Sequence, residues 1–538
     1  MTDISLIRKI NKKDMLNVIP YPNKVRLHEG GLEMKGTVTV RCPEKYSSIA
    51  EKFTADLHKS LPSLHVEDEG DIIIDFNPVT DYGQEEYSIE ISGKGIDIRA
   101  SKASGFIYAC QTLYQMLELH KFHAAGAGLP YCYIADKPRF RWRGLMLDES
   151  RHFFGKEEVL RLLEIMAMHK LNALCWHLAD DQGWRIESKR YPLLHEIGSR
   201  RSDTQVGGIR SEKFCGQGYE GFYTQEDIKE IVSKAHAMGI LVMPEISLPT
   251  HVGAMAAAYP QITCTDRSMP VATSFGDRGT LLCASGSKTR EFITGVLDEI
   301  CELFPSPYIS VRAADLHAEK WLKCDSCRKY MQEHFMHDPK QLQAAFLNDV
   351  SEHLKKRGRR MLCENGAMAD GMSRDIIGIY SSAGRDKTIP DQLRWGRSYI
   401  VSRPEYLNFD LPYCSLPLLR TYEFDPDKEL KGCRYLHGKV MGIQANLWTE
   451  WIYDREKFDM CLFPRMAALA EAAWTEPGEK NRQRFTRRLA AYRELLEGSG
   501  INYAKDKICM PRNIISRLRK QYYYNLTDQY IEVRENRK

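Results

Sequence analysis

Residues 140–178 have the sequence FRWRGLMLDESRHFFGKEEVLRLLEIMAMHKLNALCWHL, and this stretch decides the fold. Phe140–Leu147 and Ala173–Leu178 are short apolar runs with the length of a buried strand, and Lys156–His169 between them has the apolar spacing of an amphipathic helix. A strand, a helix and a second strand in this order form the repeating unit of a parallel sheet. The stretch therefore predicts an α/β fold.

The same unit recurs along the following part of the chain. A second helix, Thr224–Met238, begins with Thr at the N-cap and acidic residues in its first turn, and Gly239 follows where a helix ends. The predicted strands are Phe140–Leu147, Ala173–Leu178, Leu241–Ile246, Tyr308–Ala313, Met361–Cys363, Ile376–Tyr380, Tyr406–Phe409 and Val440–Leu447. Eight strands that alternate with helices predict a (β/α)8 TIM barrel over residues 138–476.

Two smaller regions flank the predicted barrel. Residues 1–137 are expected to form an N-terminal α/β domain, with strands at Asp71–Phe76, Tyr87–Ser92 and Gly95–Ala100 and a helix at Ser104–His120. Residues 477–538 are basic and helical in pattern, and we expect a C-terminal extension packed on the barrel.

Composition excludes several classes of protein. Of the 538 residues, 43% are hydrophobic and 28% charged, which is typical of a globular chain, and the net charge of +4 offers no electrostatic case for nucleic acid or an anionic membrane. Apolar stretches such as Gly239–Ile246 are far shorter than the roughly 20 residues of a membrane-spanning helix. Charged residues stand where a signal peptide would have its apolar segment, so we expect a cytoplasmic protein.

The fifteen cysteines show no repeating spacing, and Cys110, Cys175 and Cys283 lie in apolar runs where a reduced thiol packs as a small hydrophobe. Cys324 and Cys327 have the spacing of half a zinc site, but the sequence has no second Cys-x-x-Cys or His-x-x-x-His partner. We therefore expect no disulfide framework, no metal and no cofactor.

Polar and aromatic residues gather at the predicted strand ends, which face one common pocket in a barrel. They are Asp148, Arg151, His177, Asp180, Asp181, Glu245, His251, Asp315, His317, Glu364, Tyr380, Tyr406, Asn408, Trp448 and Glu450. Carboxylates and arginine can bind sugar hydroxyls, aromatic rings can stack on pyranose faces, and paired acids can transfer protons, so the inventory favours a sugar site. The alternative that Asp148, His177 and Glu245 merely cap strand ends stays open.

Four motifs carry a resemblance to a known family: RGLMLDESRHF (143–153), WHLADDQGWR (176–185), MPEI (243–246) and NLWTE (446–450). They are similar to family 20 glycoside hydrolases, the β-N-acetylhexosaminidases, and the resemblance extends to the N-terminal α/β domain. It implies that Arg151, Asp180 and Glu450 bind hydroxyls of the terminal sugar and that Trp448 forms the pocket wall. It also implies that His251 lies near the general acid and that Tyr406 hydrogen-bonds the acetamido oxygen.

The fourth strand departs from this family. Members end it with His-x-Gly-Gly-Asp-Glu, whereas residues 308–315 here are YISVRAAD. Alignment on Trp321 and Cys324 places Ala314 and Asp315 at the positions of the catalytic pair and Arg312 at a glycine. The acetamido pocket differs as well: Glu364 and Tyr380 lie in regions where the family carries tryptophans, and Asn408 replaces an aspartate.

Three hypotheses follow for an oligosaccharide or small glycoside as partner. In the first, the chain is an exo-acting glycoside hydrolase of the β-N-acetylhexosaminidase family with Asp315 as a shortened general acid. In the second, it hydrolyses a sugar without a 2-acetamido group, using Asp315 and Glu364, although Glu364 could equally form a salt bridge to Arg312. In the third, it binds sugars without catalysis, and Arg312 fills the subsite or clamps an anionic group. A homodimer is left open.

Overall fold

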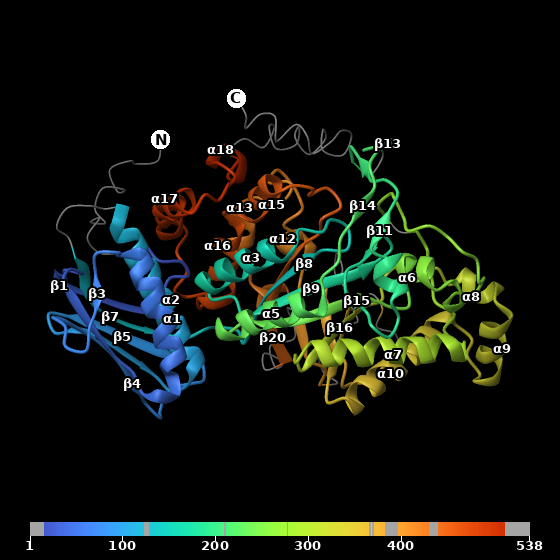
Figure 1. Ribbon diagram of the computed structural model, residues 1–538, viewed down its shortest axis with the longest axis horizontal. Coiled ribbons are helices and arrows are strands. Elements are labelled where there is room, and N and C mark those ends of the chain that lie inside the picture. The colour runs from blue at the N-terminus through green and yellow to red at the C-terminus, as the bar shows by residue number, and fades with distance from the viewer. Residues whose placement is uncertain are drawn as a thin grey trace.

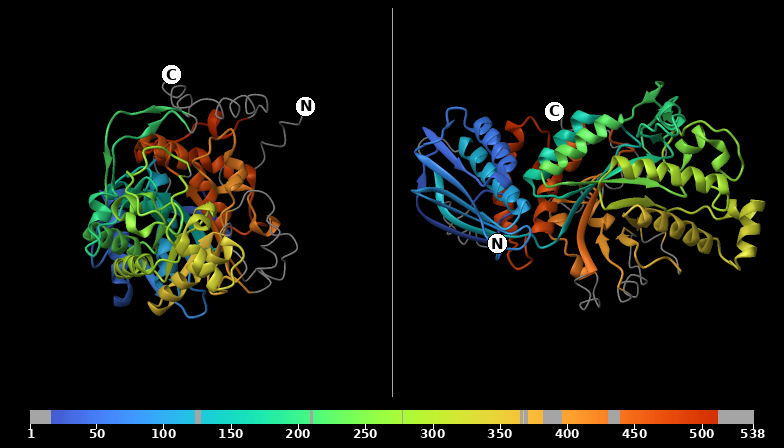
Figure 2. Two further views of the ribbon diagram at one scale, coloured as in Figure 1. Left: turned by 90° about the vertical axis from the view of Figure 1, so that its right-hand side faces the viewer. Right: turned by 60° about the horizontal axis from the view of Figure 1, so that its bottom comes forward.

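The computed structural model describes residues 16–122, 128–208, 211–276, 278–364, 367, 371–381, 396–429 and 439–511. The chain forms a small α/β domain at one end of an elongated molecule and a barrel beside it (Figures 1 and 2). This architecture confirms the predicted fold class: the sheet-and-helix domain precedes a closed parallel barrel.

The N-terminal domain is one mixed sheet of seven strands, in the order β1-β7-β5-β6-β4-β2-β3. The strands are β1 (Lys24–Leu32), β2 (Thr37–Arg41), β3 (His65–Val66), β4 (Ile72–Pro78), β5 (Tyr87–Ser92), β6 (Gly95–Ala100) and β7 (Leu129–Asp136). The short η2 (Glu44–Tyr46) leads into α1 (Ser47–Ser60), and α1 packs with α2 (Ala103–Phe122) beside the sheet. Phe53, Ile74, Ile89 and Phe106 belong to the buried core between them. The three predicted strands and the predicted helix of this domain are confirmed.

Eight parallel strands close the barrel. They are β8 (Trp142–Asp148), β9 (Ala173–Asp180), β15 (Leu241–Ser247), β16 (Tyr308–Arg312), β17 (Arg360–Glu364), β18 (Ile377–Tyr380), β19 (Tyr399–Val401) and β20 (Val440–Leu447). β8 pairs with both β20 and β9, so the sheet has no free edge. Seven of the eight predicted strands are confirmed within a few residues.

The predicted seventh strand, Tyr406–Phe409, is wrong. The seventh barrel strand is β19, and Tyr406 lies in the short helix α12 (Pro404–Leu407) that follows it. Pro404 occupies the first turn of α12, where its fixed φ favours a helical start. Asn408 nevertheless forms an isolated parallel bridge with Asn446 of β20, so the segment still reaches the end of the barrel.

Helices surround the barrel, and they include α3 (Lys156–Met168), α5 (Gln225–Ala237), α7 (Ser287–Leu303), α10 (Pro339–Lys356) and α16 (Arg465–Trp474). Thr224 and Asp227 form a complete capping box at the start of α5, as the N-cap pattern predicts. Shorter elements are β10 (Gly183–Trp184), α4 (Leu193–Glu196), β11 (Arg200–Arg201), β12 (Gln205–Val206), β13 (Lys213–Phe214), β14 (Tyr219–Glu220), α6 (Gly253–Ala258), η3 (Pro260–Ile262), α8 (Glu319–Lys323), α9 (Asp325–Glu333), α13 (Leu418–Tyr422), α14 (Pro426–Glu429), α15 (Arg455–Leu462) and α18 (Asp506–Cys509).

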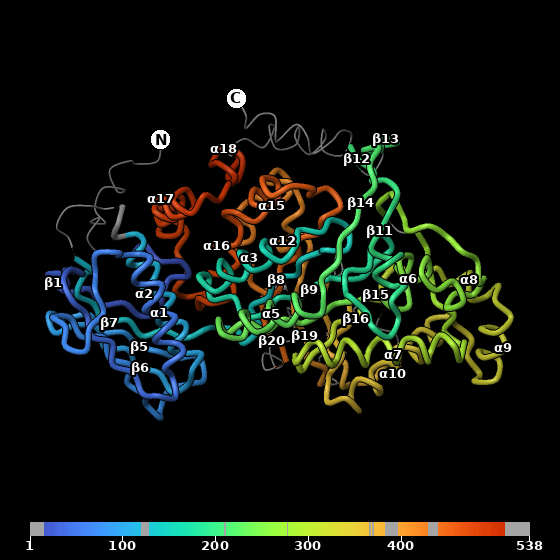
Figure 3. The backbone as a smooth tube through the Cα atoms, viewed as in Figure 1, coloured from blue at the N-terminus to red at the C-terminus, as the bar shows by residue number. Residues whose placement is uncertain are grey.

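A buried ionic junction joins the two domains. Asp136, at the end of β7, accepts hydrogen bonds from Trp474 Nε1 at 2.9 Å and from Lys170 Nζ at 3.0 Å. Arg143 of β8 donates to Glu85 at 2.7 Å and to the Tyr108 hydroxyl at 2.8 Å. Helix α17 (Arg482–Gly498) lies against α2, and Figure 3 shows it next to the N-terminal domain. Arg143, the first residue of the RGLMLDESRHF motif, therefore has a structural role between the domains.

The cysteines of the described ranges are all free thiols, and Cys110, Cys175 and Cys283 are buried as predicted. The fold also brings Cys264 and Cys283 close to Cys324 and Cys327, with the four sulfur atoms within 4.8 Å of one another, although no second Cys-x-x-Cys or His-x-x-x-His motif in the sequence indicates such neighbours. Among the described residues, no helix has both the length and the apolar character to span a membrane.

Candidate active site

The strand ends of the barrel are held together by Asp148, at the end of β8. One carboxylate oxygen accepts the backbone N–H groups of Ser150 at 3.0 Å and Arg151 at 3.2 Å, and the other accepts the N–H of Thr449 at 3.1 Å. Asp148 is fully buried. Its carboxylate therefore fixes the loop after β8 to the loop after β20, which is the capping role that the sequence left open.

Arg151 and Asp180 form the centre of the site. Their side chains are 2.9 Å apart in a buried ion pair, and Arg151 also donates to Gln182 at 3.0 Å. Burial opposes ionisation of Asp180, but the charges of Arg151 and His251 outweigh it and hold the pKa well below its usual range. The two predicted binding residues thus present a fixed cation and a fixed anion.

His177 connects this pair to the barrel interior. Its Nε2 is 3.1 Å from Asp180 and its Nδ1 is 3.0 Å from Glu245, and all three side chains are buried. Burial disfavours the imidazolium, yet the hydrogen bonds to the two carboxylates prevail and raise the pKa of His177 to about 9. Glu245 also accepts the Ser310 hydroxyl at 2.7 Å. The protonated histidine therefore orients both carboxylates.

Trp448 forms a wall beside the central pair. Two guanidinium groups lie over its ring, with the Arg151 carbon 5.3 Å and the Arg312 carbon 4.6 Å from the ring centroid. The His177 ring packs edge-on against the Trp448 ring, with the two ring centroids 5.5 Å apart. Trp448 is half-buried, so it presents aromatic surface at the strand ends, as a stacking residue for a sugar would.

Glu450 and Asp410 are acidic neighbours, and no motif in the sequence indicates Asp410. Burial raises the pKa of Glu450 above its usual range, although the charge of Arg151 opposes the shift. Burial and the charge of Glu450 raise the pKa of Asp410 to about 7. Asp410 lies two residues after Asn408, and this spacing was the only signal that could have identified it.

His251 lies between the centre and the fourth strand. Its Nδ1 is 3.1 Å from Asp181 and its Nε2 is 3.3 Å from Asp315. Burial disfavours the charged ring, but the charge of Asp180 and hydrogen bonds to three carboxylates raise the pKa of His251 to about 12. His251 and Asp315 both have left-handed backbone conformations, with φ of 56° and 60°. Such conformations cost about 1–3 kcal/mol each and persist only where the surroundings enforce them.

Arg312 stands between the two predicted catalytic carboxylates. It donates to Glu364 at 2.6 Å and lies 3.7 Å from Asp315. The hydrogen bond from His251 lowers the pKa of Asp315, with a further contribution from the charge of Arg312. Burial raises the pKa of Glu364, against the opposing charge of Arg312. Glu364 thus makes the salt bridge that the sequence offered as the alternative to a catalytic role.

Tyr380, Tyr406 and Asn408 lie near the ends of other barrel strands, apart from the central Arg151–Asp180 pair. The Tyr380 hydroxyl accepts a hydrogen bond from Arg403 at 2.8 Å, and Tyr406 stacks on Phe424 with ring centroids 4.8 Å apart. Asn408 accepts a hydrogen bond from an asparagine amide of β20 at 2.9 Å. The partners of these three side chains therefore differ from those of the central pair.

The geometry and two family models agree. Residues 140–477 match the model described as glycosyl hydrolase family 20, catalytic domain, and residues 15–137 match domain 2 of the same family. The chain belongs to glycosyl hydrolase family 20.

Relatives of this family 20 chain span several bacteria. A β-hexosaminidase of Porphyromonas gingivalis is 31% identical over 91% of this chain, which spans 64% of that protein's length. A β-hexosaminidase of Vibrio furnissii is 31% identical, with 85% of this chain and 76% of that protein aligned. A solved structure of an exo-β-N-acetylglucosaminidase from Vibrio harveyi, in complex with N-acetylglucosamine, is 29% identical with a TM-score of 0.80, and covers 92% of this chain and 80% of that chain. The fold and family are those of β-hexosaminidase-like glycoside hydrolases.

Proposed function

We propose that this family 20 chain is an exo-acting glycoside hydrolase that binds the terminal sugar of a short oligosaccharide or small glycoside. The observation that carries the proposal is the Arg151–Asp180 pair, at 2.9 Å, beside the half-buried ring of Trp448. A fixed cation and anion can bind neighbouring hydroxyls while the ring stacks on the sugar. Glu450, held near Arg151, supplies a further acceptor.

The proposed catalysis is atypical, because Ala314 and Asp315 stand at the positions of the family's Asp-Glu pair. Asp315 is the residue that we assign as general acid, with a side chain one methylene shorter than glutamate. A displacement of this size can cost about 10²-fold in rate. His251 and Arg312 also favour the ionised form of Asp315, whose pKa is lowered, whereas a general acid must be protonated. We therefore expect slow turnover that rises as the pH falls below neutrality.

The same lowered pKa favours a second candidate, a sugar-binding protein without turnover. In that case the central pair and Trp448 bind the sugar, and Asp315 stays a carboxylate. A two-carboxylate mechanism is less well supported, because the Arg312 guanidinium lies 2.6 Å from Glu364 and neutralises it. The engagement of Arg312 by Glu364 likewise disfavours a clamp for an anionic substrate. A cytoplasmic location and a homodimer stay predictions.

The test is a hydrolysis screen on aryl β-glycosides with and without a 2-acetamido group. Asp315→Asn, Glu364→Gln and the wild-type chain are compared, and Glu319→Gln is the matched control because Glu319 is a neighbouring carboxylate with 57% of its side chain exposed. We expect turnover of the acetamido set, reduced about 10²-fold or more by Asp315→Asn alone. The control should retain wild-type activity.

Other outcomes separate the alternatives. Turnover of 2-hydroxy sugars that both catalytic variants lose would establish a two-carboxylate enzyme. Absence of cleavage, with sugars that raise the melting temperature of the wild type but not of Trp448→Ala, would establish a binding protein. Neither turnover nor a thermal shift with any sugar would overturn the proposal.

A further inference from the structure

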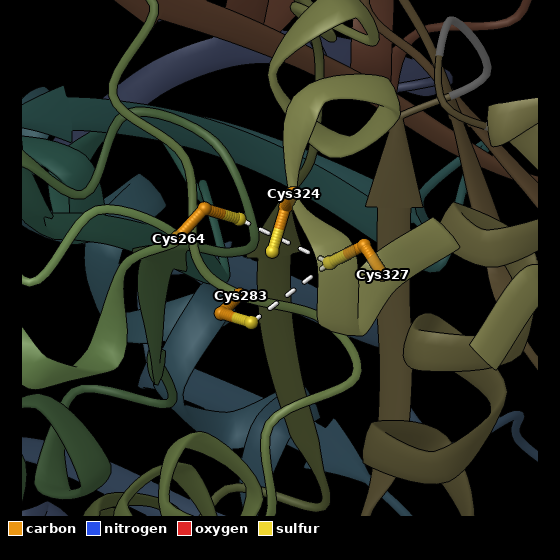
Figure 4. A group of neighbouring side chains, drawn as sticks. All are labelled: Cys264, Cys283, Cys324 and Cys327. Carbon is orange, nitrogen blue, oxygen red and sulfur yellow. Dashed lines mark hydrogen bonds between the residues drawn. The ribbon is translucent and has the colours of Figure 1, made fainter. Parts of the chain in front are cut away.

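Four cysteine side chains converge outside the strand-end pocket. Cys264 follows η3, Cys283 precedes α7, and Cys324 and Cys327 lie at the start of α9. Figure 4 shows the four sulfur atoms directed toward one another. The Cys327 sulfur is 3.9 Å from that of Cys264 and 3.8 Å from that of Cys283, and all four lie within 4.8 Å of one another.

These separations do not fit a disulfide but do fit a shared ion. A disulfide requires sulfur atoms about 2.05 Å apart. Four thiolates bound tetrahedrally to one zinc ion, with Zn–S bonds of about 2.3 Å, have sulfur atoms about 3.8 Å apart. An iron–sulfur cluster, with cysteines on different iron atoms, needs wider spacing than a set within 4.8 Å. The arrangement therefore matches a single tetrahedral ion.

The backbone around the cluster is ordered by contacts that involve no metal. Cys283 donates its N–H to Ile262 at 2.8 Å, which keeps it beside the η3 segment. Cys283 and Cys327 are buried, whereas Cys264 and Cys324 are half-buried. Ser285 is a further polar neighbour, and its hydroxyl lies 3.4 Å from the Cys327 sulfur. Four preorganised thiols with only partial solvent access are typical of a closed structural site.

We propose that Cys264, Cys283, Cys324 and Cys327 bind one zinc ion that has a structural rather than catalytic role. Four protein thiolates occupy every position of the ion, so no coordination position stays open for water or substrate. Soft thiolate ligands in tetrahedral geometry select zinc over calcium or magnesium. The proposal does not depend on the function of the barrel pocket.

The position of the site gives the ion a defined task. Leu282, next to Cys283, donates its N–H to Pro249 at 2.9 Å and accepts the indole N–H of Trp321 at 2.8 Å. The Thr250 hydroxyl donates to the Ala314 carbonyl at 2.7 Å. Pro249 and Thr250 precede His251, and Ala314 precedes Asp315, so the ion fastens together the two loops that carry the left-handed residues of the pocket.

The test begins with the metal content of the full chain, purified in reductant without chelator. We expect about one zinc ion per chain, with four sulfur ligands at about 2.3 Å in X-ray absorption spectra. Cys324→Ser and Cys327→Ser should lose most of the bound zinc. Cys42→Ser is the matched control, because Cys42 is a half-buried thiol of the N-terminal domain, and it should keep full occupancy.

A second measurement keeps the proposal testable if the variants fail to fold. Wild-type chain depleted with a chelator should bind Co²⁺ and show the absorption bands of tetrahedral thiolate coordination, and zinc should displace it and raise the melting temperature. Absence of zinc together with no uptake of Co²⁺ by reduced wild-type chain would overturn the proposal. So would zinc coordinated by nitrogen or oxygen ligands, or disulfides between the four cysteines that persist in the presence of reductant.

Discussion

The charged side chains at the carboxyl ends of the barrel strands fall into two sectors, which differ in how the charges are paired and buried. In the sector of β8 and β9, Arg151, Asp180 and His177 are buried and joined in one network. In the sector of β16, Asp315 has 53% of its side chain exposed and is paired with His251 and Arg312 near the pocket edge. The contrast indicates that the first sector is built to bind in one geometry, whereas the charges of the second sector can be rearranged at lower cost.

The largest expected effect follows from removing Asp180. In Asp180→Ala the charged groups of Arg151 and His177 stay buried without their shared partner, and breaking a buried pair in this way costs about 3–5 kcal/mol. Urea denaturation measures the loss, and sugar binding should disappear with it. Asp375→Ala is the control, since Asp375 has 60% of its side chain exposed in a surface ion pair with Lys355. A decrease in the free energy of unfolding below about 1 kcal/mol would show that the buried ion pair contributes no more to stability than a surface ion pair.

A smaller effect is expected from Arg312→Ala in the second sector. Glu364 has only 13% of its side chain exposed, so it would lose its partner while largely buried, at a cost of about 1–3 kcal/mol. Arg312→Ala combined with Glu364→Gln should recover part of this loss, because the unpaired charge is then absent. A double-mutant cycle of unfolding free energies measures the coupling. Strict additivity would contradict the role of Arg312 as partner of Glu364.

A further expected effect is a pH dependence of stability that His251 carries between the sectors. Its folded pKa of about 12 lies above the unfolded value of about 6.5, so its stabilisation is complete below the unfolded pKa and is lost as the pH rises toward the folded pKa. The difference in unfolding free energy between wild type and His251→Gln should be largest near pH 6 and shrink at alkaline pH. Asp315→Asn is the control, because it removes the charge of the exposed carboxylate beside His251 and leaves the histidine in place. A difference independent of pH would refute the assignment of a charged His251.

Much of the barrel could be predicted because a buried parallel strand is an apolar run with its own local signal. Tyr406–Phe409 is the exception, because its pattern is strand-like but the segment begins within the short helix α12, which starts at Pro404. The seventh barrel strand is the shorter β19, which precedes this helix. The binding residues were predictable because strand ends of a barrel share one pocket. The sequence permits the salt bridge between Arg312 and Glu364 only as one alternative, because side-chain pairing across strands depends on register and rotamer rather than on spacing along the chain.

By itself, the sequence determined the family, the α/β barrel and the strand-end inventory, because hydrophobic periodicity and contiguous motifs are local properties of the chain. Only the tertiary structure decided which of those side chains are partners. It placed Asp410 beside Glu450 and set Arg312 between Glu364 and Asp315. It also assembled a four-cysteine cluster from segments far apart along the chain. Such contacts arise when loops fold against one another, and no local pattern encodes the distance between two thiols on different loops.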